Sequence, residues 1–228
     1  MASSRRQRTA GLCLGAWLWW TAVAVALPLQ DHLPPTDLAG RPVSAEQLRG
    51  RITVLVLAGQ ANEAEATAVS DEIVAAMNAQ PERYAFVVVM DLAGVPEFGR
   101  GLSVAIVRER LEREDQLLAA RLEQGGQTFK PPLRLQLPDW SGQATRFWLA
   151  AIPEAGYAVF RAPEGHTRFE RDRLRRERQR LRSEVQVFVL DEKHELKAQY
   201  VGRSAGARAI EAMRTLQPHS PAALGNLQ

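Results

Sequence analysis

The chain has 228 residues, of which 46% are hydrophobic and 24% are charged, and its formal net charge is +3. This composition fits a single folded domain and excludes fibrous, disordered and disulfide-rich proteins, since Cys13 is the only cysteine. The excess positive charge comes from Arg5, Arg6 and Arg8, and without residues 1–26 the chain would carry 26 basic and 26 acidic residues. A neutral remainder has no general attraction to nucleic acid or to a membrane surface.

Residues 1–26 have the order of a secretory signal peptide. Three arginines precede an apolar run at residues 11–23, and residues 22–24 and 24–26 have the small-x-small pattern of a cleavage site. The apolar run ends before Pro28 and is shorter than the roughly 20 residues of a membrane-spanning helix, so we expect cleavage rather than a retained anchor. Export through a twin-arginine route is a less favoured alternative, because residues 7–9, directly after Arg5-Arg6, include no apolar residue. We therefore expect a periplasmic or secreted protein that has no stable membrane insertion and has lost Cys13.

After a proline-rich lead at residues 27–36, the chain alternates between strand-like and helix-like segments. Residues 52–58 and 84–90 are continuous apolar runs rich in β-branched side chains, which is typical of strands covered on both faces. A helix is predicted after each strand. Asn62 and Glu65 have the spacing of a capping box at the start of the first helix. The second helix ends at Gly125-Gly126 and has these residues on its inner face: Val104, Val107, Leu111, Leu118 and Leu122.

The last third of the chain predicts two hairpins and a closing helix. Residues 133–137 and 144–149 are predicted as strands, with Trp140 and Trp148 in cross-strand packing rather than in ligand stacking. Residues 185–190 and 196–201 form the second predicted hairpin, and Ser204 caps the last helix. Residues 150–184 are an insertion between the hairpins, and residues 218–228 are expected to be a disordered tail. This order of elements predicts an α/β fold with three layers.

The order β-α-β-α-β-β-α, together with residues 37–43, 47–56 and 187–191, resembles the thioredoxin and peroxiredoxin superfamily. Residues 48–54 with residues 57–65 are similar to small periplasmic proteins of the YtfJ type, in which a similar strand ends in Ala-Gly without a cysteine motif. The resemblance covers residues 33–217. It implies a thioredoxin-like three-layer sandwich with a mixed central sheet and an inserted Arg-rich helix. The chain departs from the family at this insertion and at His194, where the last hairpin turn usually has glycine.

The resemblance also implies where catalytic groups would lie. A thiol would be placed at the start of the helix after the first strand, where the helix dipole lowers its pKa. That position has Gly59 to Glu65 and no cysteine. The family's cis-proline would precede the strand at residues 185–190, where this chain has Arg182-Ser183-Glu184. Thiol chemistry is therefore not expected of the mature chain.

Four polar residues follow the two buried strands, at the edge where open α/β sheets bind ligands. They form a candidate pocket of Gln60, Asn62, Glu63 and Asp91. Glu63 and Asp91 could act as paired carboxylates in acid–base catalysis. The simpler interpretation, which we favour, is that Glu63 stabilises the helix dipole and that Asp91 ends a strand.

No cofactor or metal is expected. The four histidines are isolated, without partners at metal-ligand spacing, and the mature chain has no cysteine; they are His32, His166, His194 and His219. Residues 99–101 lack the third glycine of a dinucleotide-binding loop, and no phosphate-loop lysine motif occurs.

The insertion contains an unusually basic helix. Thr167 and Glu170 have the spacing of a capping box, and residues 168–184 hold eight arginines and four acidic residues. Only Phe169, Leu174 and Leu181 are apolar, so the helix should lie on the surface or contact a partner. A solvated face with pairs such as Asp172–Arg176 is the simpler interpretation. The candidate basic surface is Arg168, Arg171, Arg175, Arg178 and Arg182.

Two hypotheses about function follow. The leading one is a non-catalytic thioredoxin-fold protein of the bacterial periplasm that binds a protein or an anionic envelope partner, not nucleic acid. The alternative is an envelope enzyme with a thiol-independent site near Glu63 and Asp91. A deep pocket holding both carboxylates would favour the enzyme, and a projecting helix would favour binding.

Overall fold

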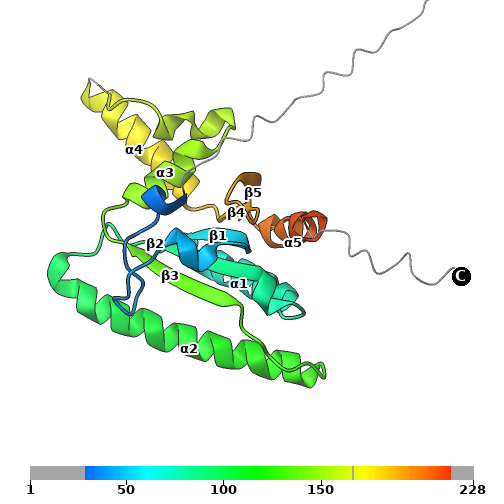
Figure 1. Ribbon diagram of the computed structural model, residues 1–228. Helices are drawn as coiled ribbons and strands as arrows, with labels where there is room; N and C mark the ends of the chain where they lie inside the picture. The colour runs from blue at the N-terminus through cyan, green and yellow to red at the C-terminus, as the bar shows by residue number, and fades with distance from the viewer. Residues whose placement is uncertain (1–28, 166, 217–228) are drawn as a thin grey trace, which may run out of the picture.

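A computed structural model describes residues 29–165 and 167–216, and its centre is a mixed five-stranded sheet (Figure 1). The strands lie in the order β3-β2-β1-β4-β5. They comprise β1 (Ile52–Gly59), β2 (Tyr84–Asp91), β3 (Leu133–Asp139), β4 (Gln186–Leu190) and β5 (Leu196–Val201). The strands β1, β2 and β3 are parallel, whereas β4 is antiparallel to β1 and to β5.

The two apolar runs form the middle of this sheet. In β1 and β2 nearly every side chain is buried, and their register pairs Ile52 with Tyr84 and Gly59 with Asp91. A strand that is buried on both faces needs cover on both sides, which explains why neither run alternates between apolar and polar residues. The same register places Gly59 and Asp91 side by side at the carboxyl edge of the sheet.

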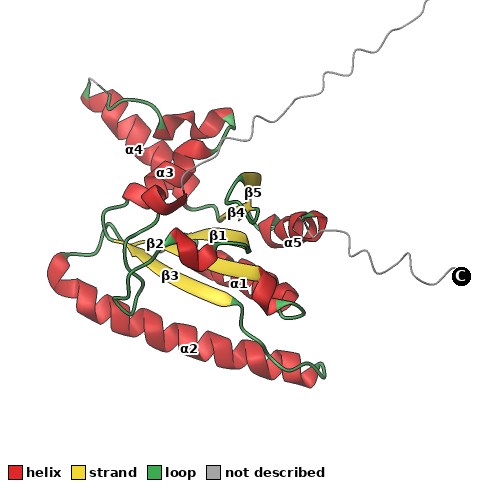
Figure 2. Cartoon of the chain, in the orientation of Figure 1, coloured by secondary structure: helices red, strands yellow, loops and turns green. Residues whose placement is uncertain are grey.

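Helices cover both faces of the sheet and make three layers (Figure 2). One face packs against α1 (Glu63–Met77), α5 (Ala205–Thr215) and the inner side of α2 (Arg100–Gln124). The other face packs against α3 (Gln143–Ala151), the 3₁₀ segment Ala155–Phe160 and the end of α4 (Arg168–Arg182). The unit β1-α1-β2 followed by β4-β5-α5, with α1 and α5 on one face and α3 on the other, is a thioredoxin-like fold, as predicted. The helix α2 and the strand β3 extend it at one edge.

The first predicted hairpin is wrong, because residues 143–151 form the helix α3. Gly142 has φ +68°, a left-handed conformation that turns the chain out of β3. The carboxylate of Asp139 then accepts the N–H of Thr145 at 2.8 Å. Trp148 is fully buried against Phe188, and its indole N–H donates to the carbonyl of His32 at 3.3 Å. Trp148 therefore fills the core from a helix and does not pack across a hairpin with Trp140.

The second hairpin and the last helix are confirmed, although the side chain of Ser204 makes no capping hydrogen bond to that helix. His194 has φ +63° at the hairpin turn, so it occupies a conformation for which glycine is better suited. The turn is held by Asp191, whose Oδ1 accepts the N–H groups of Lys193 and Glu195, both at 2.9 Å. Partial burial opposes ionisation, but the hydrogen bond from Glu195 and the contact with Lys197 outweigh it and lower the pKa of Asp191.

The ends of the predicted domain can be compared with the described residues. Leu29 is buried in the core, four residues before the expected start at residue 33. The predicted signal peptide at residues 1–26, including Cys13, and the predicted tail at residues 218–228 lie outside the described part of the chain. Within the described part, none of the helices has the length and apolar character required to cross a membrane.

Candidate functional site

A cavity of about 220 Å³ lies at the carboxyl edge of the sheet, where the loop from β1 to α1 meets the end of α4. Its lining comes from four parts of the chain that are distant in sequence. These are residues 57–62, residues 91–94 from the end of β2 onward, residues 145 and 149 of α3, and residues 179–186 from the last turn of α4 to the start of β4. The cavity therefore occupies the place at which the resemblance to thioredoxins puts a catalytic site.

Asn62 connects the two sides of this cavity. Its Oδ1 accepts the N–H of Gly59 at 2.8 Å, and its Nδ2 donates to the carbonyls of Arg182 at 3.3 Å and Glu184 at 3.1 Å. The side chain is buried and makes no capping hydrogen bond to α1. The predicted capping box with Glu65 is therefore wrong, because Asn62 satisfies backbone groups of β1 and of the segment before β4 instead.

Asp91 forms the second connection. Its carboxylate lies 3.3 Å from Nη1 of Arg182, and its other oxygen accepts the N–H of Ala93 at 3.3 Å. Both side chains are largely shielded, with 28% of Arg182 and 16% of Asp91 exposed. Asp91 therefore holds the last residue of α4 against the sheet, and its carboxylate has a cationic partner.

A chain of hydrogen bonds connects two residues of the cavity wall, Glu184 and Gln186, through Tyr157 behind it. Nε2 of Gln186 donates to the Tyr157 hydroxyl at 2.6 Å, and this hydroxyl donates to Glu184 at 3.1 Å. Burial, followed by the negative charge of Glu184, raises the pKa of Tyr157. The hydroxyl therefore keeps its proton and acts as a hydrogen-bond donor.

The lining still has unused hydrogen-bonding capacity. Of the buried polar atoms without a partner within residues 29–165 and 167–216, three belong to cavity residues, namely Oγ1 of Thr145, Nε of Arg182 and Oε1 of Gln186. One donor, one acceptor and one hydroxyl can satisfy water or a small polar molecule, but none of the three is a nucleophile with an adjacent base.

The structure separates Glu63 from the predicted pocket. Gln60, Asn62 and Asp91 line the cavity, whereas Glu63 does not. More than half of the Glu63 side chain is exposed, and it forms an ion pair with Arg110 of α2. The proposed pairing of the Glu63 and Asp91 carboxylates for acid–base catalysis is therefore wrong, because the first turn of α1 points Glu63 away from the cavity.

The groups needed for thiol chemistry are missing from this place. The sequence has no cysteine after Cys13, and the described residues contain no cis peptide bond. The segment before β4 is Arg182-Ser183-Glu184-Val185, and its backbone carbonyls bind Asn62. The cavity has the position of a thioredoxin site but not its sulfur.

The second candidate site is the basic helix α4, which begins at a capping box as predicted. Oγ1 of Thr167 accepts the N–H of Glu170 at 3.1 Å, and the Glu170 carboxylate accepts the N–H of Thr167 at 3.0 Å. Figure 1 shows that α4 extends from the sheet together with the segment that precedes it. Leu181 is buried, Leu174 is partly buried in the same cluster, and Phe169 is exposed. The last turn therefore belongs to the core, while the first turns project.

Several arginines of the predicted basic surface make contacts within the fold. Nη1 of Arg171 donates to the carbonyl of Gly165 at 3.4 Å. Arg178 donates to the carbonyls of Val159 and Ala162, both at 3.1 Å, and lies 3.0 Å from Glu164. Arg182 pairs with Asp91. The expectation that the helix lies on the surface therefore does not hold for its last turns, which contain structural contacts.

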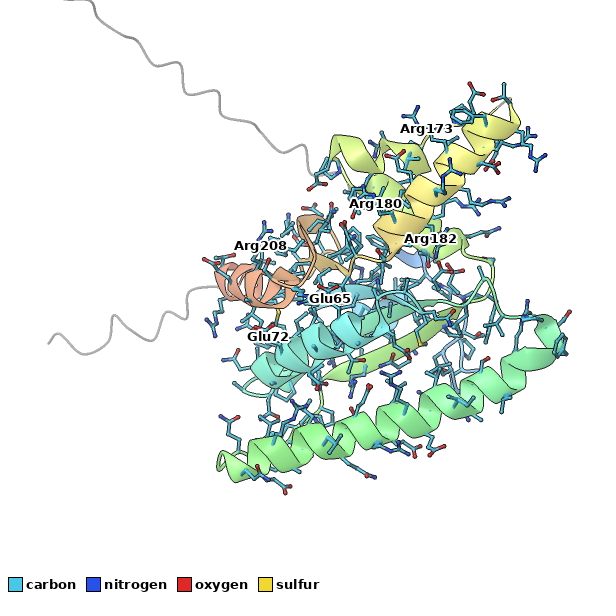
Figure 3. The ribbon with its side chains drawn as sticks, turned by 180° about the vertical axis from the view of Figure 1, so that it is seen from behind. Glu65, Glu72, Arg173, Arg180, Arg182 and Arg208 are labelled. Carbon is cyan, nitrogen blue, oxygen red and sulfur yellow. The ribbon has the colours of Figure 1, made fainter. Side chains whose placement is uncertain are left out.

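A different stripe of α4 points outward. Phe169, Arg173, Arg176 and Arg180 recur at spacings of four, three and four residues, on the side away from Leu174 and Leu181. Arg173 and Arg180 can be followed along the helix in Figure 3, in which Arg182 lies where the helix meets the sheet. Within the described residues, the guanidinium groups of Arg173 and Arg176 have no hydrogen bond or ion pair, so the expected Asp172–Arg176 pair does not form. Nη1 of Arg180 lies 3.7 Å from the carboxylate of Glu184. We call these four residues the outer arginine stripe.

The sequence contains a signal for this stripe. Leu174 and Leu181 mark the inner side of α4, and Arg178 lies between them on that side. Arginines half a turn away must face solvent. The predicted surface instead followed the longest regular series of arginines, which passes along the flank of the helix into the fold.

No protein-family model matches the sequence, and no curated protein matches it. Solved structures with similar folds include a thiol:disulfide interchange protein from Bacteroides sp., with 7% identity, a TM-score of 0.47, and coverage of 85% of this chain and 91% of that one. A thioredoxin-family thiol:disulfide interchange protein from Chlorobium tepidum TLS has 11% identity, a TM-score of 0.43, and coverage of 81% and 94%. A secreted Mycobacterium tuberculosis disulfide oxidoreductase has 11% identity, a TM-score of 0.41, and coverage of 83% and 100%. The assignment of the fold to this chain rests on its strand order and helix placement.

Proposed function

We propose that this protein is an exported, non-catalytic thioredoxin-fold protein that binds an anionic partner, a protein or an envelope component, through the outer arginine stripe of α4. The observation that carries the proposal is that some arginines of this helix contact the rest of the fold while others are exposed to solvent. Arg178 and Arg182 hold the fold, whereas Arg173 and Arg176 are exposed and have no partner within the described residues.

The composition of the cavity supports a binding role over thiol chemistry. Its polar groups either connect structural elements, as Asn62 and Asp91 do, or can at most hydrogen-bond to a small polar molecule. Thiolate attack requires a sulfur atom, and the sequence after Cys13 offers none. The fold is thus kept while the chemistry associated with it is absent.

The charge and shape of α4 support an anionic partner. Guanidinium groups bind carboxylates and phosphates in a bidentate manner, and three of them recur along one side of α4. Phe169 extends the stripe with an exposed apolar side chain, which would be covered when a partner binds.

The location outside the cytoplasm is part of the proposal. It is supported by the arginine-apolar-small order of residues 1–26 and by the likeness of residues 48–65 to periplasmic proteins of the YtfJ type. In that compartment an acidic protein segment and an anionic lipid headgroup are both available as partners, and they share the chemistry that the stripe would recognise.

The test compares binding of the purified protein to an acidic peptide and to vesicles with and without anionic lipid. Arg173→Glu/Arg176→Glu is compared with Arg203→Glu/Arg214→Glu, which has the same net charge but alters exposed arginines around α5. At about 1 kcal/mol for each arginine near an anionic surface, the first variant should weaken binding at least about tenfold. Binding by the wild type should also fall as salt screens charges over about 8 to 10 Å.

The peptide and vesicle measurements distinguish the two kinds of partner. Binding to the peptide alone indicates a protein partner, and binding to anionic vesicles alone indicates an anionic envelope component. Equal weakening by both double variants would show that only net charge matters, and it would contradict a site on α4. Reduction of a disulfide or turnover of peroxide by protein lacking Cys13 would contradict the non-catalytic part.

A further inference from the structure

The outer face of α2 carries the largest exposed group of apolar side chains in the described part of the chain. Phe98, just before α2, and Leu102, Ile106 and Leu117 within it are between 57% and 93% exposed. Phe169 of α4 is the only other large hydrophobic side chain exposed to this extent among the described residues. Contiguous exposed apolar patches of this kind mark interaction surfaces.

Helical geometry places these residues in one stripe. Phe98, Leu102 and Ile106 are spaced by four residues, and Leu117 follows Ile106 after 11 residues, which is close to three turns of 3.6 residues. Ala105 and Ala120 are exposed on the same side and keep the stripe narrow and flat. The stripe therefore runs along most of the helix, which is about 37 Å long at 1.5 Å for each of its 25 residues.

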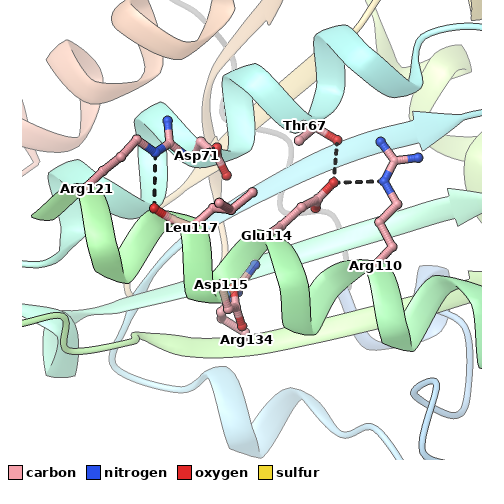
Figure 4. Close-up of polar contacts among 8 residues, drawn as sticks. All are labelled: Thr67, Asp71, Arg110, Glu114, Asp115, Leu117, Arg121 and Arg134. Carbon is pink, nitrogen blue, oxygen red and sulfur yellow. Dashed lines mark hydrogen bonds and ion pairs between the residues drawn. The ribbon is translucent and has the colours of Figure 1, made fainter.

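Contacts on the inner side fix the rotation of α2, so the stripe faces outward. Val104, Val107, Leu111 and Leu122 pack against the core, and Leu118 is buried in it. Figure 4 shows the accompanying polar contacts: Thr67 of α1 donates to Glu114, which also accepts from Arg110. Asp115 pairs with Arg134 of β3, and Arg121 pairs with Asp71 of α1. A rotation that buried the stripe would break all of these contacts.

An opposite pair of charges interrupts the stripe near its middle. Glu109 and Arg113 lie one turn apart, their charged groups are 2.9 Å from each other, and both side chains are about 70% exposed. The apolar residues lie on both sides of this pair, with Leu102 and Ile106 before it and Leu117 after it. The order along the helix is thus apolar, acidic, basic, apolar.

This order is complementary to itself in one orientation. We propose that α2 is a self-association surface at which two copies of this chain pack antiparallel about a two-fold axis level with Leu111. Residues at equal distances before and after Leu111 then face each other. Arg113 faces Glu109 of the second copy, Leu102 faces its Ala120, and Ala105 faces its Leu117.

Charge excludes the parallel orientation. With the two helices parallel and in register, Glu109 would face Glu109 and Arg113 would face Arg113, and the two helix dipoles would point the same way. The antiparallel arrangement places unlike charges opposite each other at both positions and aligns the dipoles favourably. It is also isologous, since the same patch is used on both copies, as in most two-fold dimers.

The size of the surface predicts a weak dimer. A helix face about 37 Å long and about 10 Å wide offers on the order of 400 Å² on each copy, which is at the low end of specific interfaces. We therefore expect reversible association with a dissociation constant on the order of 10 to 100 µM. Self-association in this range is independent of the role proposed for α4.

The first experiment measures mass by sedimentation equilibrium from about 1 to about 300 µM, in the full chain purified in its processed form. Wild-type protein should change from monomer to dimer over this range. Arg113→Glu and Glu109→Arg should each stay monomeric, because each puts like charges opposite each other twice. The double swap Glu109→Arg/Arg113→Glu should restore the dimer, and an equimolar mixture of the two single variants should form it too.

The second experiment tests the orientation by oxidative cross-linking of single-cysteine proteins that also carry Cys13→Ser. A mixture of Leu102→Cys and Ala120→Cys should give mixed disulfide dimers, because the antiparallel register brings these positions together. Leu102→Cys alone should cross-link poorly to itself, since its copies lie at opposite ends of the interface. Circular dichroism checks that each variant is folded, and the exposed Glu109–Arg113 pair contributes little to that stability.

A wild-type protein that remains monomeric throughout the range would overturn the proposal. Efficient self-cross-linking of Leu102→Cys without the mixed product would show a parallel pair and would also overturn it. Binding of this face to vesicles or to a different protein, without a dimer, would assign the stripe to another occupant.

Discussion

Replacing Arg178 by alanine should destabilise the fold, although arginine-rich surface helices usually tolerate such changes. Its guanidinium group donates to two backbone carbonyls, and only 23% of the side chain is exposed. A hydrogen bond to a charged group contributes about 1.5 to 3 kcal/mol, and the two carbonyls partly regain water when the side chain is removed. We expect a loss of about 2 to 3 kcal/mol in the free energy of unfolding. The ion pair with the exposed Glu164 adds little to this value.

Thermal unfolding followed by circular dichroism measures this effect. A domain of this size loses about 2 to 4 °C in Tm for each kcal/mol, so Arg178→Ala should lower Tm by about 4 to 12 °C. The matched control is Arg176→Ala, which removes the same side chain from the same helix two residues earlier. Arg176 is exposed and has no partner within the described residues, so its replacement should change the free energy of unfolding by less than about 0.5 kcal/mol.

The two variants should show the reverse order in binding. At a temperature where both are folded, Arg176→Ala should weaken binding to an acidic peptide, while Arg178→Ala should bind as the wild type does. Equal Tm values for the two variants would refute the structural role of Arg178. Equal binding losses would refute the separation between arginines that hold the fold and arginines that face a partner.

Three further predictions concern the rest of the fold. Gly142→Ala should lower the free energy of unfolding by about 1 to 2 kcal/mol, because Gly142 has a positive φ. The loss should exceed that of Gly40→Ala, since a Cβ at Gly142 would lie 3.1 Å from Ala93, whereas a Cβ at Gly40 would meet nothing within 4 Å. Urea unfolding of both variants measures the two losses. The folded state raises the pKa of Tyr157, so the free energy of unfolding should not change below about pH 10 and should fall as the pH rises above it. Tyr157→Phe should make this decrease less steep when unfolding is measured at a series of pH values. An equally steep decrease in the variant would argue against a role of Tyr157. The folded state lowers the pKa of Asp191, so its contribution to the free energy of unfolding should be complete above about pH 4 and should be lost as the pH falls further. Asp191→Asn should therefore be less stable than the wild type at neutral pH and should lose less stability on acidification. A constant difference in stability between the two proteins during acid titration would contradict this prediction.

The elements that could be predicted from the sequence are those whose pattern has one physical explanation. The runs in β1 and β2 are apolar without alternation, and only a strand covered on both faces accommodates such a run at that length. The capping box at Thr167 was equally clear, because both of its hydrogen bonds are local.

The helix α3 could not be predicted in the same way. Thr145, Phe147 and Trp148 have side chains that favour strands, and the segment is too short for its helical period to outweigh them. The helix is decided by the left-handed turn at Gly142 and by the carboxylate of Asp139, together with the space that Trp148 fills. Tertiary packing therefore overrides local propensity at this point.

The candidate site shows the same limit. Asn62 and Asp91 were located correctly at the edge of the sheet, but their partners come from the end of α4, about 90 to 120 residues later in the chain. No local pattern indicates such contacts. Glu63, in contrast, could have been excluded, since an adjacent residue in the first turn of a helix points about 100° away from Asn62.

Binding through the projecting part of α4 can be tested by removing that part and keeping the end of the helix that contacts the core. Residues 166–176 are replaced by a Gly-Ser linker of about six residues, which can span up to about 20 Å, while Arg178, Leu181 and Arg182 are kept. Binding to the acidic peptide or anionic vesicle that the wild type binds is then measured at low and high salt. We expect a Tm within a few degrees of the wild type and a loss of the salt-sensitive binding. Undiminished binding by a folded deletion variant would contradict it.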